Sequence, residues 1–393
     1  MRRLLAAAAA GVLLVVGCSS AAPRSTEALV VVSAPLSTSP WIGRAIERGA
    51  RLAAVELAGT RTPVRLEVLD NGGSPQRAVA HARRAVDRRA AALVTDGTGA
   101  AAIAGVSEPA RLPVFVTFQG GASILDPAAR RTVFRIAPAN KPMSIRLADY
   151  LAEQHPRVAL LSDDSSYGRE GAAAMRLAFR RDEVPVVADL TVPAAAAALA
   201  PQVLAARRAG ATVLVLWCSA GDVAAAVEAA RGSGWDVPVY AGPTGEDPLV
   251  RQRLAAHPGW VTGMTFVSFR ITSEAGPEPF ERYRAAYEKR FGAERVGVRQ
   301  DGRDVVQPPD WSMFGYDAVR LVAAARARGG SLLDALENTT ITGANGDERG
   351  FGAQQREGVS PDDMYFARFD GFVFAPVKDD VLSVGLPAVP QLR

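Results

Sequence analysis

The sequence predicts an α/β protein made of two similar lobes, and two observations carry this prediction. Short runs of β-branched residues alternate with Ala-, Leu- and Arg-rich segments of helical length, which is the pattern of βαβ units in a parallel sheet. This alternation restarts after residues 132–135, so a single sheet does not account for it. Open parallel sheets bind ligands beyond the carboxyl ends of their strands. Two such lobes facing each other would therefore enclose a cleft that closes about a hinge.

Capping and turn residues delimit the elements of the first half. We predict strands at residues 29–32, 64–69, 91–95 and 114–118. We predict helices at residues 42–57, 74–88 and 99–108. Residues 70–73 have the sequence Asp-Asn-Gly-Gly, which is typical of a turn. Ser74 then serves as the cap of the next helix and Pro75 as its first residue.

The second half repeats the alternation and then departs from it. We predict strands at residues 158–162, 186–190, 212–217, 237–241 and 261–266. We predict helices at residues 140–153, 167–180, 197–209 and 222–231, with a short one near 247–256. In the last third, helices at 279–291 and 312–328 flank a loop at 296–309. Asp370-Gly371 indicates a hairpin between strand-like pieces at 364–370 and 372–376.

The N-terminus has the layout of a secretory signal peptide. A positive start at residues 1–3 precedes an apolar stretch at 4–16 that is too short to span a membrane. Gly17-Cys18 follows, in the pattern of the bacterial lipobox, where the signal is cut before a cysteine that receives lipid. We therefore expect a signal peptide at 1–17, lipid on Cys18 and a flexible tether at 18–27. An ordinary signal with a chance cysteine is the alternative.

Composition excludes several classes of function. No apolar run approaches the roughly 20 residues of a spanning helix, so a polytopic membrane protein is excluded. The formal net charge of +4 is small for 393 residues, and we expect no nucleic-acid partner. With Cys18 lipidated, Cys218 has no partner for a disulfide. No CxxC, HExxH or Cys/His cluster exists, so we expect no zinc site, whereas a carboxylate-only Ca²⁺ or Mg²⁺ site stays open.

Enzymatic activity finds no support in the motifs. The chain has no GxSxG elbow and no recognisable nucleophile, so we predict that it is not an enzyme and needs no cofactor. Gly97, Gly99 and Ala102 fit the spacing of a dinucleotide loop. The acid that this fingerprint requires on the next strand end is absent, because that end has the sequence Thr-Phe-Gln-Gly-Gly at 117–121.

Three loops that follow predicted strands are candidate ligand contacts. The loop at 96–102 opens a helix, whose free N–H groups favour a small anion; a tight turn with packing glycines is the alternative. The loop at 119–123 combines small residues with Gln119 and Ser123, and is either a ligand contact or a flexible loop. Tyr167 would point from the first turn of its helix toward the cleft, or lie half-buried at the helix start.

Short motifs in a fixed order connect these features to a known family. They are Ala-Pro-Leu-Ser at 34–37 with Ile42-Gly43 and Gly49-Ala50, Leu-Asp-Asn at 69–71 with Pro-Gln-Arg-Ala at 75–78, Val116-Thr117 after Leu112-Pro113, Ser-Tyr-Gly at 166–168, Gly-Pro-Thr-Gly at 242–245 and Gly-Tyr-Asp-Ala at 315–318. With them the chain resembles the type I periplasmic binding proteins of ABC importers, specifically the leucine/isoleucine/valine-binding type. The resemblance extends from about residue 29 to 376.

The resemblance implies two Rossmann-like lobes joined by three crossovers, with a hinge and an interlobe cleft. It places the crossovers near 136–140, 266–269 and 342–345. The implied first lobe comprises residues 28–138 and 268–342. The implied second lobe comprises 139–267 and 343–378, and a C-terminal tail follows at 379–393.

The resemblance also implies which residues contact a ligand. In the family the ligand carboxylate sits on hydroxyl and N–H groups of the first lobe, which map onto Thr98, Gly99, Gln119, Gly120 and Gly121. Tyr167 would close from the second lobe, and Trp41 would line the pocket. The hydroxyl expected near Gly121 is missing, with Ser123 nearby, and an expected aromatic maps close to Ser219.

One position departs from the amino-acid binders. The acid that holds a ligand ammonium after Gly-Pro is Thr244 here, and Glu246 lies two residues on. Burying an ammonium without an acid is unfavourable. An amino acid with Glu246 as its partner therefore stays open beside amides, urea-like molecules and small organic acids.

We expect a monomeric lipoprotein, anchored to the membrane through Cys18 and facing the extracytoplasmic side. It would capture a small polar ligand by lobe closure and deliver it to ABC permease subunits, with Trp41, Tyr167 and Trp217 as apolar walls. A sensory or regulatory lipoprotein that binds a protein partner is the first alternative. An enzyme on the same scaffold is the second.

Overall fold

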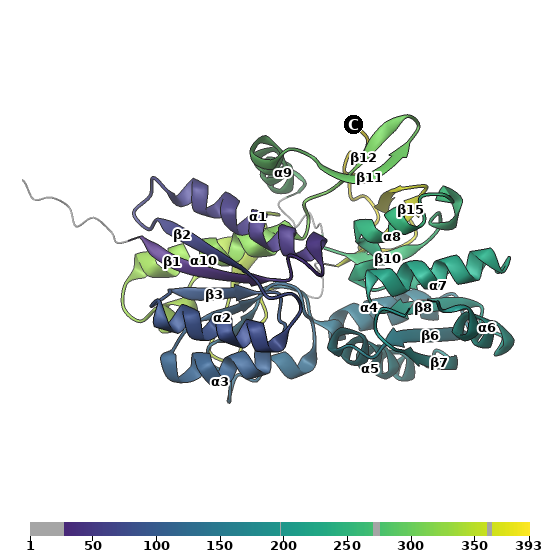
Figure 1. The fold of residues 1–393 in the computed structure, drawn as a ribbon, viewed down its shortest axis with the longest axis horizontal. Coiled ribbons are helices and arrows are strands. Elements are labelled where there is room, and N and C mark those ends of the chain that lie inside the picture. Colours follow the sequence, from purple (N-terminus) through teal and green to yellow (C-terminus); the bar gives the residue numbers. More distant parts are fainter. Residues whose placement is uncertain (1–26, 197, 270–275, 360–363) are drawn as a thin grey trace, which may run out of the picture.

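The computed structural model describes residues 27–196, 198–269, 276–359 and 364–393. Two α/β lobes lie side by side, each a largely parallel sheet with helices on its faces (Figure 1). This confirms the fold class that the strand and helix alternation predicts. The predicted signal peptide at 1–17, Cys18 and all but the last residue of the tether at 18–27 lie outside the described residues.

The first lobe contains a five-stranded parallel sheet of order β2-β1-β3-β4-β5. Its strands are β1 (Ala28–Ala34), β2 (Val64–Asp70), β3 (Ala92–Thr95), β4 (Val114–Val116) and β5 (Val133–Arg135). The helices that accompany it are α1 (Pro40–Leu57), α2 (Pro75–Asp87), α3 (Ala100–Ala110), α10 (Ser312–Arg328) and α11 (Leu332–Leu336). β1, β3 and β4 are fully buried, as their β-branched and aliphatic sequence requires in a sheet covered on both faces.

Glycine allows α1 and α10 to pack closely. A Cβ on Gly49 would lie 1.9 Å from the carbonyl oxygen of Ser312, and one on Gly315 would lie 2.4 Å from that of Ile46. Each helix therefore places a glycine where the other backbone approaches. This contact ties α10, which comes late in the chain, to the first helix of the lobe.

The second lobe contains a seven-stranded sheet of order β16-β15-β10-β9-β8-β6-β7. Its strands are β6 (Val158–Asp163), β7 (Val186–Val192), β8 (Val213–Trp217), β9 (Val239–Ala241), β10 (Thr265–Ser268), β15 (Tyr365–Asp370) and β16 (Val373–Pro376). Its helices are α4 (Asn140–Ala152), α5 (Ser166–Arg181), α6 (Ala200–Arg208), α7 (Ala220–Gly232) and α8 (Pro248–Arg253). β15 and β16 run antiparallel and pair Asp370 with Val373, which confirms the hairpin expected at Asp370-Gly371.

The prediction of a loop at 296–309 is wrong, because β11 (Glu294–Gln300) and β12 (Arg303–Gln307) form an antiparallel hairpin there. Val296 and Val298 alternate with exposed residues on β11 and join the apolar core of the second lobe. Asp301 and Gly302 both have positive φ, of 49° and 73°, as a two-residue hairpin turn requires. The hairpin follows α9 (Glu278–Phe291), and both lie along the upper edge of the molecule in Figure 1.

The third crossover expected near 342–345 is also displaced. β13 (Thr340–Thr342) and β14 (Glu348–Gly350) form a hairpin whose Ala344 N–H donates to Asp317 of α10 at 2.9 Å. Glu357 pairs with Arg135 of β5, and Phe351 packs on Phe134. Residues 343–358 therefore lie with the first lobe.

The segment expected as a C-terminal tail, 379–393, packs on the second lobe and the β11–β12 hairpin. Asp380 is buried and accepts two hydrogen bonds from Arg146, at 2.8 and 2.9 Å. Gln391 bonds both backbone groups of Phe374, and Val306 N–H donates to the Gln391 carbonyl. This segment thus completes the fold.

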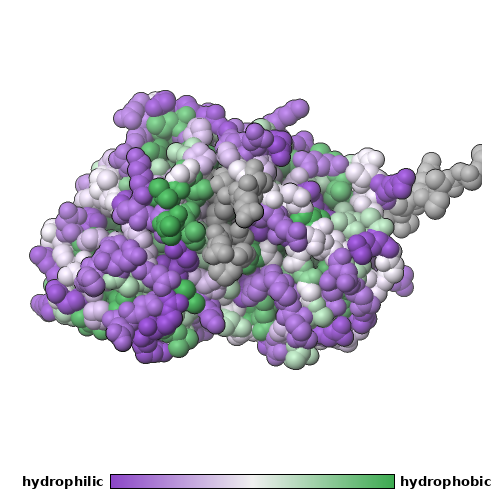
Figure 2. All heavy atoms as spheres, turned by 180° about the vertical axis from the view of Figure 1, so that it is seen from behind, coloured by the Kyte–Doolittle hydropathy of each residue, from purple (hydrophilic) through white to green (hydrophobic). Residues whose placement is uncertain are grey.

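Within the described ranges, no helix combines the length and the apolar character needed to cross a membrane. Seen from behind, the surface is largely hydrophilic, with a compact apolar cluster near the junction of the lobes (Figure 2). The C-terminal segment exposes three large apolar side chains, those of Val381, Leu382 and Val384.

Candidate functional site

A cavity of about 800 Å³ lies between the lobes, at the carboxyl ends of strands from both sheets. Its lining includes Trp41, Asp96, Thr98, Phe118 and Gln119 from the first lobe, and Asp163, Tyr167, Ser219, Asp222 and Thr244 from the second. A smaller cavity of about 480 Å³ lies at the other end of the first lobe, among Val86, Leu112 and Leu333. Only the first of these two lies where open parallel sheets bind ligands.

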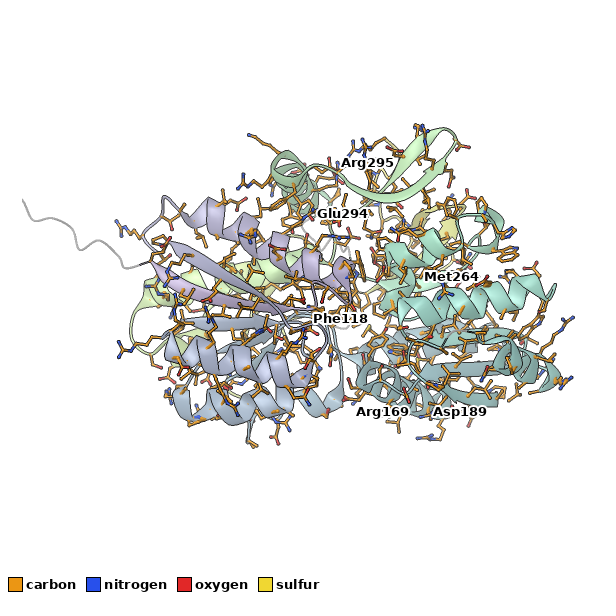
Figure 3. The ribbon with its side chains drawn as sticks, in the orientation of Figure 1. Phe118, Arg169, Asp189, Met264, Glu294 and Arg295 are labelled. Carbon is orange, nitrogen blue, oxygen red and sulfur yellow. The ribbon has the colours of Figure 1, made fainter. Side chains whose placement is uncertain are left out.

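Aromatic rings form a continuous wall of the interlobe cavity. Phe118 lies at the junction of the two lobes (Figure 3) and stacks on Tyr167 of the opposite lobe, with ring centroids 6.1 Å apart. Trp311, which is buried and lies outside the lining, packs behind this wall at 5.2 Å from Phe118 and 5.7 Å from Trp41. Trp217 packs behind Tyr167 at 6.4 Å and is fully buried outside the lining. The wall offers a flat apolar surface to a ligand.

The start of α5 positions Tyr167. Ser165 caps this helix by accepting from the Gly168 N–H at 3.1 Å. The Thr244 hydroxyl donates to the carbonyl of Cys218 at 2.7 Å, so the Tyr167 hydroxyl, 3.4 Å from Thr244 Oγ1, is the donor of that pair. Burial raises the pKa of Tyr167, so the phenol stays neutral at physiological pH.

A buried carboxylate occupies the first-lobe side of the cavity. Asp96 follows β3 directly, is 3 % exposed, and accepts from the Thr98 hydroxyl at 2.5 Å and the Asn71 amide at 2.8 Å. The Gln119 amide donates to Thr98 Oγ1 at 3.3 Å. Burial raises the pKa of Asp96. Because the Thr98 proton is engaged by Asp96, this loop holds a carboxylate where the resemblance implies that a ligand carboxylate would bind.

The second-lobe side is built on the cap of α7. The Ser219 N–H donates to Asp163 Oδ2 at 2.7 Å, and its hydroxyl donates to Asp222 Oδ2 at 2.7 Å. Asp222 Oδ2 also accepts from the Ala195 N–H at 3.1 Å, which ties the loop after β7 to the helix start. Asp163 and Asp222 are both fully buried.

Glu246 lies in a network at the hinge and is absent from the cavity lining. It is fully buried, and its carboxylate accepts from Gln307 Nε2 at 2.8 Å, Ser268 Oγ at 2.9 Å and Trp311 Nε1 at 3.0 Å. Arg251, also buried, bonds the Glu246 carbonyl and Gln307. This carboxylate is thus held by groups of the protein itself.

Four further predicted residues lie beside the cavity and are not part of its lining. Gly99 is the αL cap of α3, with φ of 71°, and a Cβ on Gly120 would meet Asn140 in the first crossover at 2.5 Å. Ser123 donates to Glu170 of α5 at 2.7 Å, and a Cβ on Gly121 would lie 1.9 Å from that carboxylate. Gly121 and Ser123 therefore form a direct contact between the lobes.

Six of the eleven predicted residues line the cavity, namely Trp41, Thr98, Gln119, Tyr167, Ser219 and Thr244. Sequence reasoning missed Asp96, Phe118, Asp222 and Asp247 as lining residues. The sequence contained a usable signal for two of these residues. Asp96 comes directly after the predicted strand at 91–95, and Phe118 is the last residue of the predicted strand at 114–118. Asp222 stands three residues after the helix cap Ser219, which is the spacing of a capping box. A capping role explains an acid at this position, so nothing in the sequence indicated that Asp222 also lines the cleft.

The described residues contain no group of three or more His, Cys, Asp or Glu that could hold a metal ion. Cys218 is buried, and burial raises the pKa of its thiol well above the usual value. The site therefore offers hydrogen bonds, carboxylates and aromatic surface, which are the means of reversible ligand binding.

Comparison with known proteins places this geometry in context. Residues 29–372 match a family model described as periplasmic binding protein. A periplasmic binding protein type 1 from Bordetella pertussis has a TM-score of 0.77 at 17 % identity, over 89 % of this chain and 99 % of its own. The leucine-binding protein LivK from Thermotoga maritima has a TM-score of 0.75 at 16 % identity, over 89 % and 97 %.

A third similar structure contains a ligand. The branched-chain amino acid transporter substrate-binding protein LivJ from Streptococcus pneumoniae, in complex with isoleucine, has a TM-score of 0.74 at 17 % identity, over 89 % of this chain and 99 % of its own. No curated protein matches the chain.

Proposed function

Because the chain belongs to the periplasmic binding protein family, whose members are extracytoplasmic binding proteins and not enzymes, we propose that it is a lipoprotein that captures a small polar solute for an ABC importer. The family assignment confirms the resemblance found in the sequence. The single observation that carries solute capture is the cavity between the lobes. Both lobes line it with aromatic and polar side chains, and its volume of about 800 Å³ suits a small molecule.

Lobe closure would bury the ligand against Phe118 and Tyr167, which stack on each other across the two lobes. A ligand that contacts both lobes binds the closed state better than the open one, and so shifts the population toward closure. The hydrogen bond from Ser123 to Glu170, at 2.7 Å, would further stabilise the closed state. Capture needs no covalent chemistry in this account.

The membrane anchor is supported by the sequence around Cys18, in which a charged start, an apolar stretch and Gly17-Cys18 follow in register. Lipid on Cys18 would keep the lobes beside permease subunits on the extracytoplasmic side. The residues between Cys18 and β1 would serve as the tether.

A thermal-shift screen of the full chain carrying Cys18→Ser tests solute capture. The protein is first unfolded and refolded to remove any ligand carried through purification. The panel contains amino acids, amides, urea, polyamines, aromatic acids and sugars. A ligand at about 100 times its Kd adds roughly 2.7 kcal/mol to stability, which is a shift of several degrees. If the folded protein responds to no member of the panel, the proposal fails in favour of a regulatory lipoprotein that binds a protein.

A further inference from the structure

The chain enters the first lobe at one end of the molecule. β1 begins at Ala28, at the end of the first lobe that points away from the second lobe (Figure 1). The five strands of this sheet are parallel, so all of them begin at the same edge. The Ala28 N–H donates to the Pro63 carbonyl before β2, and the Leu93 N–H of β3 donates to the Pro113 carbonyl before β4. The segments that lead into these strands therefore lie side by side.

These segments contain arginine and no acid. Residues 58–63, 88–91 and 111–113 connect a helix of the first lobe to β2, β3 and β4. Their charged residues are all exposed, and they are Arg61, Arg88, Arg89 and Arg111. In the second lobe, the segments that connect a helix to β6, β7, β8 and β9 contain one arginine and four acids, within residues 153–157, 182–185, 209–212 and 233–238. The excess of arginine in the connecting segments is thus particular to the first lobe.

The cavity of about 480 Å³ lies at this end of the first lobe. Three arginines line it, Arg89, Arg111 and Arg326, and the described lining contains no Asp or Glu. Arg111 also pairs with Asp334 at 3.0 Å, outside the lining. The apolar part of the lining includes Val86, Leu112 and Leu333. Guanidinium groups beside apolar surface match a phosphate group that is joined to an apolar chain.

The proposed lipid anchor places this end of the first lobe near the membrane. Ten residue steps separate Cys18 from Ala28, so even a fully extended tether reaches only about 35 Å. A short tether holds the arginines and the lipid headgroups at a high effective concentration. Contacts that are weak individually are then sufficient for binding.

We propose that this end of the first lobe lies on an anionic membrane surface, where Arg89, Arg111 and Arg326 bind the phosphate of a lipid headgroup. The proposal rests on the lipid anchor of the proposed function and adds an orientation to it. Charge-assisted hydrogen bonds from the guanidinium groups bind the phosphate oxygens, and the exposed Arg61 and Arg88 add to the attraction. The strands of the first lobe then point away from the membrane, so the interlobe cavity at their carboxyl ends lies away from the lipid.

Vesicle flotation tests this surface in the absence of the anchor. The chain from residue 18 on, with Cys18→Ser, contains every residue that the structure describes. It lacks the lipid and the apolar stretch at 4–16, each of which would bind a membrane by itself. The vesicles contain phosphatidylcholine alone, or equal parts of phosphatidylcholine and phosphatidylglycerol. We expect at least about tenfold more protein on the anionic vesicles at low salt, and loss of this difference at high salt.

Paired variants locate the contact. Arg89→Gln/Arg111→Gln removes two guanidinium groups from the cavity lining, and we expect binding to anionic vesicles to fall by about tenfold or more. Arg180→Gln/Arg208→Gln is the matched control, because it removes the same charge from two exposed positions at helix ends of the second lobe. This control should bind as the unmodified surface does. Thermal unfolding checks that both variants are folded.

The outcomes separate this proposal from solute capture. Absence of a preference for the anionic vesicles, or equal losses in the two variants, would overturn the proposal. A thermal shift with inorganic phosphate, without binding to vesicles, would also overturn it, because the cavity would then take a free anion. None of these results bears on solute capture, which the ligand screen decides. Mass spectrometry of Cys18 in the membrane fraction decides the anchor separately.

Discussion

The indole N–H of Trp311 donates to the carboxylate of Glu246 over 3.0 Å, and this pair joins the second lobe to the aromatic wall of the cleft. Trp311 stands at the start of α10 in the first lobe, whereas Glu246 follows β9 in the second. The Trp311 ring also packs on Trp41 and Phe118, which line the cavity. The hydrogen bond to Glu246 therefore helps to fix the position of the rings at the cavity surface. Glu246 therefore acts as a positioning residue at the hinge.

Replacing Glu246 tests this role. Glu246→Ala leaves the Trp311 and Gln307 donors unpaired and removes the negative charge nearest the buried Arg251. We expect a loss of about 3 kcal/mol or more in the free energy of unfolding, measured with urea. Glu228→Ala, at a half-exposed side chain with a 3.9 Å ion pair, should change it little. Unchanged stability with lost ligand binding would instead make Glu246 a ligand contact.

Gly121→Ala should open the lobes. The added methyl group would lie 1.9 Å from the Glu170 carboxylate and displace the contact with Ser123. We expect a larger radius of gyration by small-angle X-ray scattering and weaker ligand binding, because the closed state is less populated. Gly105→Ala is the control, since a Cβ there meets nothing within 4 Å. Equal scattering curves for both variants would exclude the contact as a closure element.

The C-terminal segment should contribute to stability. Removal of residues 379–393 breaks the Arg146–Asp380 pair and the bonds of Gln391 to Phe374. We expect the Tm to fall by several degrees, since each kcal/mol corresponds to a few degrees in a protein of this size. Hydrogen exchange should rise in β12 and β16, which this segment covers. A truncated protein with the wild-type Tm would show that the segment is dispensable.

Asp247 should make the ligand-free protein less stable as the pH rises. Burial raises its pKa from 3.8 to about 6, with Arg44 and Arg251 opposing the shift. The folded state therefore keeps this proton up to about pH 6, whereas the unfolded chain loses it near pH 4. The stabilisation is complete below about pH 4 and is lost as the pH rises through 6.

Asp247→Asn removes that titration and keeps an oxygen for the Leu249 N–H at the helix cap. Relative to this variant, wild type should lose about 1 to 3 kcal/mol between pH 4 and 7. Urea unfolding at each pH measures the difference. Parallel pH profiles for the two proteins would contradict the raised pKa of Asp247.

The two lobes could be predicted from the sequence because the signals for their strands and helices lie within short stretches of sequence. The alternation of β-branched and Ala-rich segments reflects burial on both faces of a sheet, and each cap or turn lies within a few residues. The hairpin at 294–307 carried the same kind of signal, because Val296 and Val298 alternate with other residues before the turn pair Asp301-Gly302. It was missed because the surrounding composition is typical of a loop.

The site could be predicted only in part. Strand-end residues such as Thr98 and Gln119 follow from the rule that ligands bind at the carboxyl ends of parallel strands. The direction of a side chain after a turn does not follow from that rule. Glu246 and Asp222 each follow a strand of the second lobe by five residues, so the sequence alone would place both of them at the same cleft. Hydrogen bonds from residues 268, 307 and 311 hold the Glu246 carboxylate at the hinge, whereas the hydrogen bond from Ser219 at the α7 cap holds Asp222 beside the cavity.

Capture between the lobes is the central claim, and a comparison of ligand stabilisation in two proteins tests it most directly. The strongest ligand from the thermal-shift screen is applied to wild type and to a Thr98→Ala/Tyr167→Ala variant that is folded by circular dichroism. We predict a shift of several degrees in wild type and nearly none in the variant, because the variant lacks one contact from each lobe. An equal shift in both proteins would place the ligand outside the interlobe cavity and contradict the account.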